Sequence, residues 1–458
     1  MNDAQSHIRA LASFAKIIAK SDFVDADEIW QLQLDLLEAQ QGIQVSIAAE
    51  KTLPRAKQDR ERLEELRRIR WHARSMGDAL VWVLLGGDKQ LIGALSHNSP
   101  VPIAEDGYGT RGAQHIAAGL SSQGWGFPVL HDISNLLRIG DVTFVRVDGR
   151  VPRSITVEVK TQLLDVSEPD DSGKRTYQVK TKVLTPVPLD DSGNLPPDVV
   201  YEPAELPRDD MPRGRVGRQK ERMRRAAILG SSPDGVVSGL TEPFIHMSVD
   251  TSSTDNWPHL RRIIRRAHAE GFAGEVVDDA FYYGAFYSKG GVTADDIAAA
   301  PLEESLKDSA FKRTDATADR PVLVWTLPTE PSRAPTVSLP YVLYPVTQRA
   351  VLELLRYELL LLVMVDQTVV CDALRARGLE VEVRPQAGGP GEIVVVDRWV
   401  NDDGDHVKAE LHAVRHIMQE TIDEFRGLDY LADMVAGMVA GMRTHAPAEW
   451  DEDEAGQS

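Results

Sequence analysis

The chain has 458 residues, which is too many for one compact hydrophobic core and predicts two or three domains. Hydrophobic residues (42%) and charged residues (26%) occur at levels usual for soluble globular proteins. The formal net charge of −19 argues against a protein that coats nucleic acid with its whole surface, so any nucleic-acid site has to be a local basic patch.

Cysteine content and apolar runs bear on the compartment. The single cysteine, Cys371, excludes a disulfide within the chain and a cysteine-ligated zinc site. Residues 1–10 lack the basic stretch and apolar core of a signal peptide. The most apolar run, 352–366, contains charged residues and is too short to cross a bilayer, so we expect a helix buried in a protein core. A cytoplasmic protein without a membrane partner is predicted.

Helical patterns occupy residues 1–85. Residues 25–40 begin with a capping-type acidic turn and carry apolar residues at steps of three and four. Residues 55–85 start as a charged helix and become almost wholly apolar before Gly86-Gly87. The sequence therefore predicts a helical N-terminal region, 1–58, and a long helix that opens the next domain.

A β-hairpin is predicted next. The alternating runs 141–147 and 155–161 flank the turn residues Asp148-Gly149, and 175–184 alternates like a further strand. The Pro- and Asp-rich stretch 185–212 predicts an exposed loop.

The hairpin brings two acids and a lysine to one end. Glu158 and Lys160 share a strand face because successive side chains alternate. With the turn centred near Arg150, Asp141 faces the neighbourhood of Val159, within reach of both. Two close carboxylates resist joint ionisation unless a cation lies between them, and oxygen ligands suit Mg²⁺ or Mn²⁺. A nearby ammonium can orient water and offset transition-state charge, so a phosphodiesterase centre is predicted.

A basic helix over 213–230 follows. Residues 213–225 contain six arginines and one lysine against one acid, Glu221. Arginine forks match phosphate oxygens, which predicts nucleic-acid contact. A solvated helix face that pairs with surface acids is the alternative. The residues we select as nucleic-acid contacts are Arg215, Arg218, Gln219, Lys220, Arg222 and Arg225.

Beyond residue 252 the patterns predict a C-terminal α/β domain, 253–445, and an acidic tail, 446–458. The helix at 257–271 is interpreted as amphipathic packing with a charged exposed face, with nucleic-acid contact the less favoured reading. A strand is also expected at 243–249, before this domain. The other expected elements within it are strands at 280–288 and 322–328, a long helix over 346–377, a strand pair within 380–400, and a helical region over 405–442.

The spacing D-x(16)-E-x-K across a hairpin resembles the PD-(D/E)XK, or restriction-endonuclease-like, nuclease superfamily. The resemblance implies that Asp141 and Glu158 bind the metal and that Lys160 is catalytic. It also implies an αβββαβ core within a mixed α+β fold, with the domain at 59–252 and a long insertion at 161–212. Gln219 is the nearest match to a glutamine that several such families carry on the helix after E-x-K.

The resemblance implies a metal-dependent nuclease that hydrolyses phosphodiester bonds, DNA being favoured over RNA, in restriction, anti-phage defence or repair. A partner protein or homo-oligomer through the C-terminal region is a further expectation. The chain departs from the pattern at Gly140, where proline is common. The extra acid often found on the first helix stays open among Glu61, Glu64, Glu65 and Asp78.

Two other functions stay open. A catalytically inactive nuclease-like scaffold would lack metal binding. A HEPN-like, metal-independent RNase rests on the R-x-x-x-x-H spacing of Arg67 and His72. Two further motifs were considered. His131-Asp132 lacks the partners of an HD phosphohydrolase. Of His406, His412 and His416, the last two lie one helical turn apart and are interpreted as a helix-face pair rather than as part of a zinc site.

Overall fold

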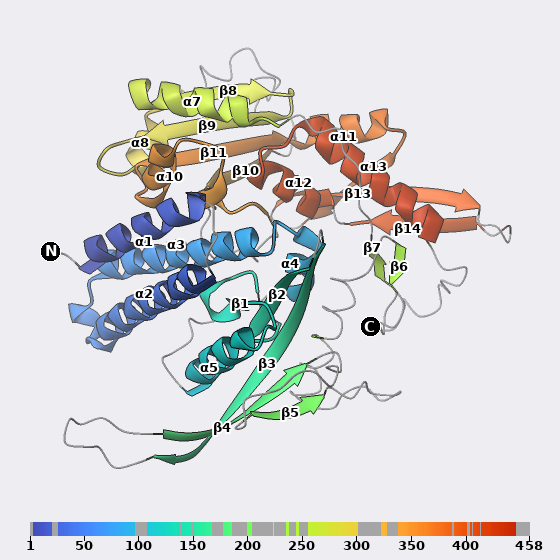
Figure 1. Ribbon diagram of the computed structural model, residues 1–458. Helices are drawn as coiled ribbons and strands as arrows, with labels where there is room; N and C mark the ends of the chain where they lie inside the picture. Colours follow the sequence, from blue (N-terminus) through green and yellow to red (C-terminus); the bar gives the residue numbers. More distant parts are fainter. Residues whose placement is uncertain are drawn as a thin grey trace. The chain divides into compact units, whose positions relative to one another are not determined.

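A computed structural model describes residues 3–20, 26–96, 108–137, 139–148, 151–166, 177–185, 199–203, 223, 235–237, 244–246, 255–300, 322–327, 338–386, 389–400, 404, 406–412 and 414–445. The chain forms two compact units. Unit 1 comprises Met1–Ser232 and Glu330–Tyr344, and unit 2 comprises Pro233–Thr329 and Pro345–Ser458. Both units combine helices with sheet (Figure 1), and the predicted mixed α+β class is confirmed.

Unit 1 begins with three long helices that lie side by side (Figure 1). They are α1 (Asp3–Lys20), α2 (Ala26–Thr52) and α3 (Arg60–Leu84). The side chain of Asp59 caps α3 by accepting from the amide of Arg62, and Gly86 and Gly87 follow the helix with positive φ angles of 65° and 70°. The region predicted as separate, 1–58, therefore packs against α3 within the same unit.

A five-stranded sheet completes the larger part of unit 1, in the order β1-β2-β3-β4-β5. All neighbours are antiparallel except β4 and β5, which are parallel. Its strands and the accompanying helices are α4 (Lys89–Leu95), α5 (Tyr108–Ser122), β1 (Phe127–Leu130), the 3-10 turn η2 (His131–Ile133), β2 (Val142–Asp148), β3 (Val151–Val166), β4 (Tyr177–Thr185) and β5 (Val199–Pro203).

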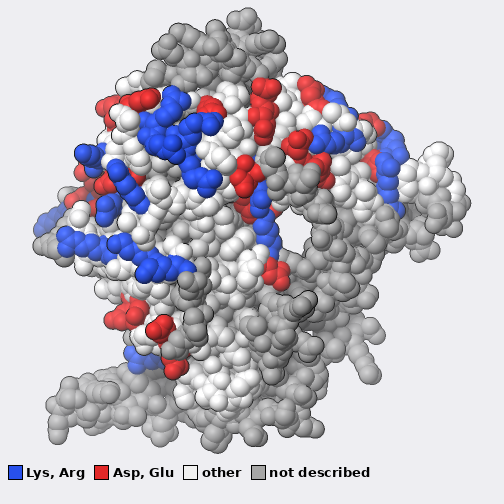
Figure 2. Space-filling view, turned by 45° about the horizontal axis from the view of Figure 1, so that its top comes forward, with Lys and Arg blue, Asp and Glu red and all other residues white. Residues whose placement is uncertain are grey.

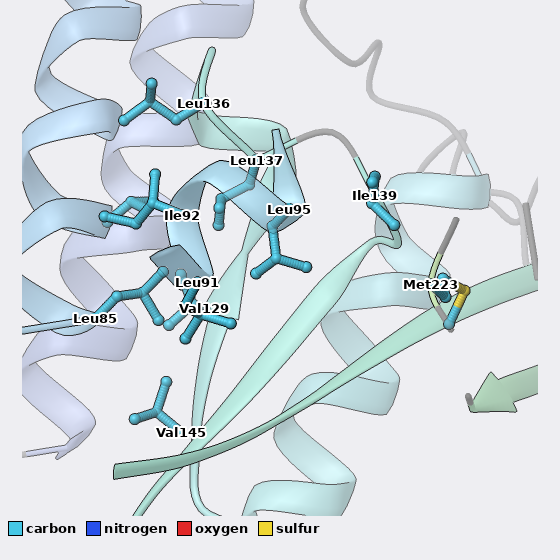
Figure 3. Packing of buried hydrophobic residues seen from close by; sticks show 11 residues of the cluster. Leu85, Leu91, Ile92, Leu95, Val129, Leu136, Leu137, Ile139, Val145 and Met223 are labelled. Carbon is cyan, nitrogen blue, oxygen red and sulfur yellow. The ribbon is translucent and has the colours of Figure 1, made fainter. Parts of the chain in front are cut away.

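Helix α5 covers one face of this sheet. A Cβ built on Gly112 of α5 would lie 1.9 Å from Thr161 Oγ1 of β3, so glycine lets the helix approach the strand. Because side chains alternate along β3, Glu158 and Lys160 belong to the opposite face. Part of that side is a hydrophobic cluster built from α3, α4, β1 and β2, which includes Leu85, Ile92 and Val145 (Figure 3).

Buried glutamines hold the segment that leads into β2. The side chain of Gln33 donates to the carbonyl of Pro128 at 2.9 Å and accepts from the amide of Leu130 at 2.9 Å. Gln40 donates to the carbonyl of Ile133 at 2.8 Å. These bonds satisfy backbone groups that helix packing removes from water, and they fix the approach to the hairpin.

Unit 2 contains a four-stranded antiparallel sheet, β10-β11-β9-β8, a three-stranded sheet, β12-β13-β14, and a two-stranded sheet, β6-β7. The elements are β6 (Gly235–Val237), β7 (Phe244–His246), α7 (Trp257–Glu270), β8 (Phe272–Val277), β9 (Phe281–Tyr287), α8 (Ala294–Ala298), β10 (Val322–Leu327), α10 (Gln348–Leu355), β11 (Leu359–Asp366), α11 (Gln367–Ala376), β12 (Glu380–Gln386), β13 (Gly389–Val400), β14 (His406–Leu411), α12 (Val414–Asp423) and α13 (Leu428–His445).

The prediction of one long helix over 346–377 is wrong. The segment forms α10, then the strand β11, then α11. Tyr357, between α10 and β11, has a left-handed φ of 58° and ends the helical course. Strand β11 pairs with β10 on one side and β9 on the other and is buried, so its side chains read as a continuous apolar run.

Three smaller expectations also differ. The stretch 185–212, predicted as exposed loop, contains β5. The helical region predicted from 405 begins instead with β14, because its first residues pair with β13. The strand predicted at 243–249 is β7, which pairs with β6 in a separate two-stranded sheet rather than joining the sheet that contains β3. Among the described helices none is long and apolar enough to cross a membrane.

Candidate active site

The hairpin of β2 and β3 brings Asp141 level with Glu158. The register pairs Val142 with Val157, so Asp141, directly before β2, comes opposite Glu158. The amide of Asp141 donates to the carbonyl of Val157 at 2.8 Å, and the amide of Val159 donates to Asp141 Oδ2 at 2.5 Å. The predicted proximity of Asp141 to Val159 is confirmed.

Gly140 explains the departure from proline before the first acid. Its φ is 82°, whereas a proline ring holds φ at about −65°. A Cβ at this position would lie 2.5 Å from Thr156 Cγ2 and 2.9 Å from the carbonyl oxygen of Val157. The chain therefore needs glycine to turn Asp141 onto β3.

Glu158 and Lys160 lie two residues apart on β3. Glu158 is 5% exposed, whereas the side chain of Lys160 is 44% exposed and its Nζ contacts Glu158 Oε1. The site therefore joins a half-buried carboxyl group, Asp141, to a buried one, Glu158, and reaches solvent on the side of the lysine.

The electrostatics of Asp141 are unusual for a carboxyl group. Burial, followed by the neighbouring charge of Glu158, raises its pKa to about 7. Asp132 raises that pKa further, while the amide of Val159 and the charge of Lys160 lower it. Near neutral pH the site thus favours a proton on Asp141 or a cation beside it.

A solvated strand pair in unit 2 provides a comparison. Lys408 and Glu410 also lie two residues apart, on β14, at 2.8 Å. There Arg384 and Lys408 hold the pKa of Glu410 well below its usual range. On this exposed strand the cationic neighbours, Arg384 first, lower the pKa of the acid, whereas the rise at Asp141 comes from burial and from the charge of Glu158.

A ladder of buried polar side chains supports the site. The amide of His131 donates to the carbonyl of Asp141 at 3.0 Å, and His131 Nε2 lies 2.8 Å from Thr143 Oγ1. Thr143 Oγ1 is in turn 2.8 Å from Thr156 Oγ1. Sequence reasoning missed this support. Strand alternation places Thr156 on the same face as Glu158, and this pattern could have predicted that Thr156 lies near the site.

The acids considered on α3 do not join the site. Asp78 Oδ1 accepts from Ser134 Oγ at 2.7 Å and from the amides of Asn135 and Leu136 at 2.5 and 3.0 Å, which makes it a clamp for the loop after η2. Glu64 contacts Arg67 on the exposed side of the helix. Within the described residues, none of the four candidate acids contacts Asp141.

Asp141 and Glu158 suit a hard divalent cation by their chemistry. Both are carboxylates, and Val159 occupies only Oδ2 of Asp141. Burial and the charge of Glu158 raise the pKa of Asp141, and a cation between the two carboxylates would offset their repulsion. No group of three or more His, Cys, Asp or Glu side chains suited to a metal occurs among the described residues.

The basic helix predicted over 213–230 lies outside the described residues except for one position. Met223 is helical and buried in the hydrophobic cluster, near Ile139 (Figure 3). The residues predicted to contact nucleic acid and lying outside the described part are Arg215, Arg218, Gln219, Lys220, Arg222 and Arg225.

The geometry gives no support to the HEPN-like alternative. His72 is 1% exposed, its Nδ1 lies 2.7 Å from the hydroxyl of Tyr341, and burial lowers its pKa to about 3. Trp71 stacks on Tyr341 beside it. Arg67 is exposed and contacts Glu64. A histidine enclosed in this way is a packed core residue.

His412 and His416 do not form the helix-face pair that was predicted. His406 belongs to β14, and His412 lies just after that strand, 3.1 Å from Glu392 Oε1 and 3.3 Å from Glu410 Oε2. His416 is exposed on α12. The pairing of β14 with β13 makes the first part of this segment a strand, so only His416 of the three lies on a helix.

Comparison with known proteins adds no identification. No protein-family model, no curated protein and no solved structure matches the chain.

Proposed function

We propose that the chain is a metal-dependent nuclease of the PD-(D/E)XK type, acting on phosphodiester bonds with DNA favoured over RNA. The observation that carries the proposal is the half-buried Asp141 beside the buried Glu158, with Lys160 at the solvent side. A structural pair on a strand face would instead be solvated, like Lys408 and Glu410. Restriction, defence or repair is the setting that the family resemblance suggests.

Each residue has a distinct part in the proposed reaction. Asp141 Oδ1 and the Glu158 carboxylate would hold Mg²⁺ or Mn²⁺, which supplies compensating charge and lowers the pKa of bound water. Lys160 Nζ would orient the attacking water and offset negative charge on the phosphoryl oxygens. The amide of Val159 fixes Asp141 through Oδ2, so that Oδ1 keeps its direction.

Cleavage of plasmid DNA and of RNA, with Mg²⁺ or Mn²⁺ and with EDTA, tests the proposal. Asp141→Ala, Glu158→Gln and Lys160→Met should each abolish cleavage, and double variants should be scarcely worse because the three act as one unit. Glu410→Gln is the matched control, since it removes a lysine-paired acid from a strand in unit 2. Its activity should equal that of the wild type.

Metal binding gives a second, activity-independent readout. A cation that binds only the folded site should raise the melting temperature of the wild type. At a free cation concentration of 100 times Kd, the free energy of unfolding should increase by about 2.7 kcal/mol. Asp141→Ala should not respond. Full cleavage by any of the three variants, or an equal Mn²⁺ response in wild type and Asp141→Ala, contradicts the assignment.

A further inference from the structure

Helix α7 of unit 2 has two dissimilar faces. Its buried side chains are Trp257, Leu260, Ile263, Ile264 and Ala267, which pack toward β8 and β9. Its exposed face carries Arg261, Arg262, Arg265 and Arg266. The expected amphipathic packing is therefore confirmed, and packing alone accounts for the apolar face but not for four arginines on the other.

The arginines differ in how their charges are compensated. Arg262 is engaged with both carboxylate oxygens of Glu275, and Arg266 lies 3.6 Å from Glu270. Arg261 instead donates to the carbonyl oxygen of Pro345 at 3.1 Å, which is a neutral acceptor. Arg265 has no ion pair within the described residues.

The side of α7 that bears Arg261 and Arg265 continues onto α10. His268, one turn beyond Arg265, has Nε2 2.6 Å from Glu353 Oε2 of α10. Arg349 of α10 lies 2.7 Å from the same carboxylate and is 65% exposed, whereas Glu353 is 6% exposed. The carboxylate thus lies beneath the surface and the guanidinium above it. Figure 2 shows basic side chains gathered over the α7 face.

We infer that this face, Arg261 and Arg265 of α7 with Arg349 of α10, binds the phosphate backbone of nucleic acid. Guanidinium groups donate in pairs to phosphate oxygens. Arg349 is paired with Glu353, but Arg261 and Arg265 form no ion pair within the described residues, so on a chain of net charge −19 this face has a local attraction for polyanions. Such contacts hold a strand without reading its sequence. The choice of nucleic acid over another polyanion rests on the proposed nuclease function.

The spacing suits a strand. Residues four apart on a helix are separated by about 6 Å along its axis, while phosphates of one duplex strand recur about every 3.4 Å, so Arg261 and Arg265 can each meet a different phosphate. The slope of log affinity against log salt concentration is negative. Loss of both contacts should make it shallower by about 1.8 for duplex DNA and by about 1.4 for a single strand. Binding at low salt should weaken roughly three- to tenfold.

The test is fluorescence anisotropy of the full chain with labelled duplex and single-stranded DNA in EDTA, at several KCl concentrations. Arg261→Gln/Arg265→Gln is compared with Arg262→Gln/Arg266→Gln. Both variants change the net charge equally on the same helix, but the second removes arginines already engaged with Glu275 and Glu270. Only the first should flatten the salt dependence by the full amount.

The outcomes are distinct. Equal effects of the two double variants, or no binding by the wild type, overturn the inference. A further outcome is that the wild type is an oligomer that binds no nucleic acid and that Arg261→Gln/Arg265→Gln dissociates. That outcome would assign the face to a protein partner and would also overturn the inference. Binding is measured in EDTA, where metal-dependent cleavage cannot occur, and cleavage is measured separately in Mg²⁺. If the chain binds DNA through α7 but does not cleave it in Mg²⁺, only the nuclease proposal is refuted. Cleavage together with an unaltered salt slope refutes only this inference.

Discussion

Replacement of Asp141 by asparagine should stabilise the metal-free protein at alkaline pH. Asp141 lies half-buried beside Glu158, and its pKa is about 7 in the folded chain against 3.8 for an ordinary aspartate. The difference of about 3 pH units, at about 1.4 kcal/mol for each, amounts to about 4 kcal/mol. The asparagine side chain would keep an acceptor for the amide of Val159 while carrying no charge.

The sign follows from proton linkage. The folded state holds the proton on Asp141 more tightly than the unfolded state, so protonation of Asp141 stabilises the folded chain. This stabilisation is fully present below about pH 4 and is lost as pH rises to about 7. Wild type should therefore lose stability relative to Asp141→Asn across this window. Below about pH 4 the two proteins should be nearly equal, and above about pH 7 the variant should be more stable by about 4 kcal/mol.

Urea unfolding in EDTA, followed by tryptophan fluorescence from about pH 4 to about pH 9, measures the difference. Trp125 packs edge-to-face on Phe144 of β2 at 5.6 Å and so reports on this sheet. Addition of Mn²⁺ at alkaline pH should narrow the gap, since the cation compensates the carboxylates only in the wild type. A stability difference that does not change with pH would refute the reasoning.

Two further predictions concern the frame of unit 1. A Cβ on Gly77 would lie 1.7 Å from the carbonyl oxygen of Ile133, so Gly77→Ala should lower stability by about 1–3 kcal/mol in thermal melts, while Gly109→Ala on α5, with open space around it, should not. Tyr341→Phe removes the hydroxyl 2.7 Å from His72 Nδ1 and should cost about 1–3 kcal/mol of unfolding free energy, whereas unchanged stability would contradict the buried bond.

Local features were open to prediction because their causes lie within one turn or one hairpin. The amphipathic spacing of α7 depends on residues three or four apart. The register of β2 with β3 follows from the two-residue connection after Asp148, which is why the contact of Asp141 with the amide of Val159 could be anticipated.

Other features depended on partners distant in the chain. The run 359–366 is as apolar as a buried helix, and only its pairing with β9 and β10 makes it the strand β11. The parallel partner of β4, Val199–Pro203, lies in a Pro- and Asp-rich stretch whose composition favours a loop. Strand pairing decides both cases, because backbone hydrogen bonds are completed by neighbours that no local pattern specifies.

The candidate site divides in the same way. Sequence alone determined which groups are present and that a hairpin would bring Asp141, Glu158 and Lys160 to one end. Tertiary structure decided that Glu158 is 5% exposed, that the pKa of Asp141 is raised, and that His72 is enclosed beside Tyr341. Burial depends on everything that packs around a side chain, so desolvation, which dominates both pKa shifts, is a property of the assembled fold.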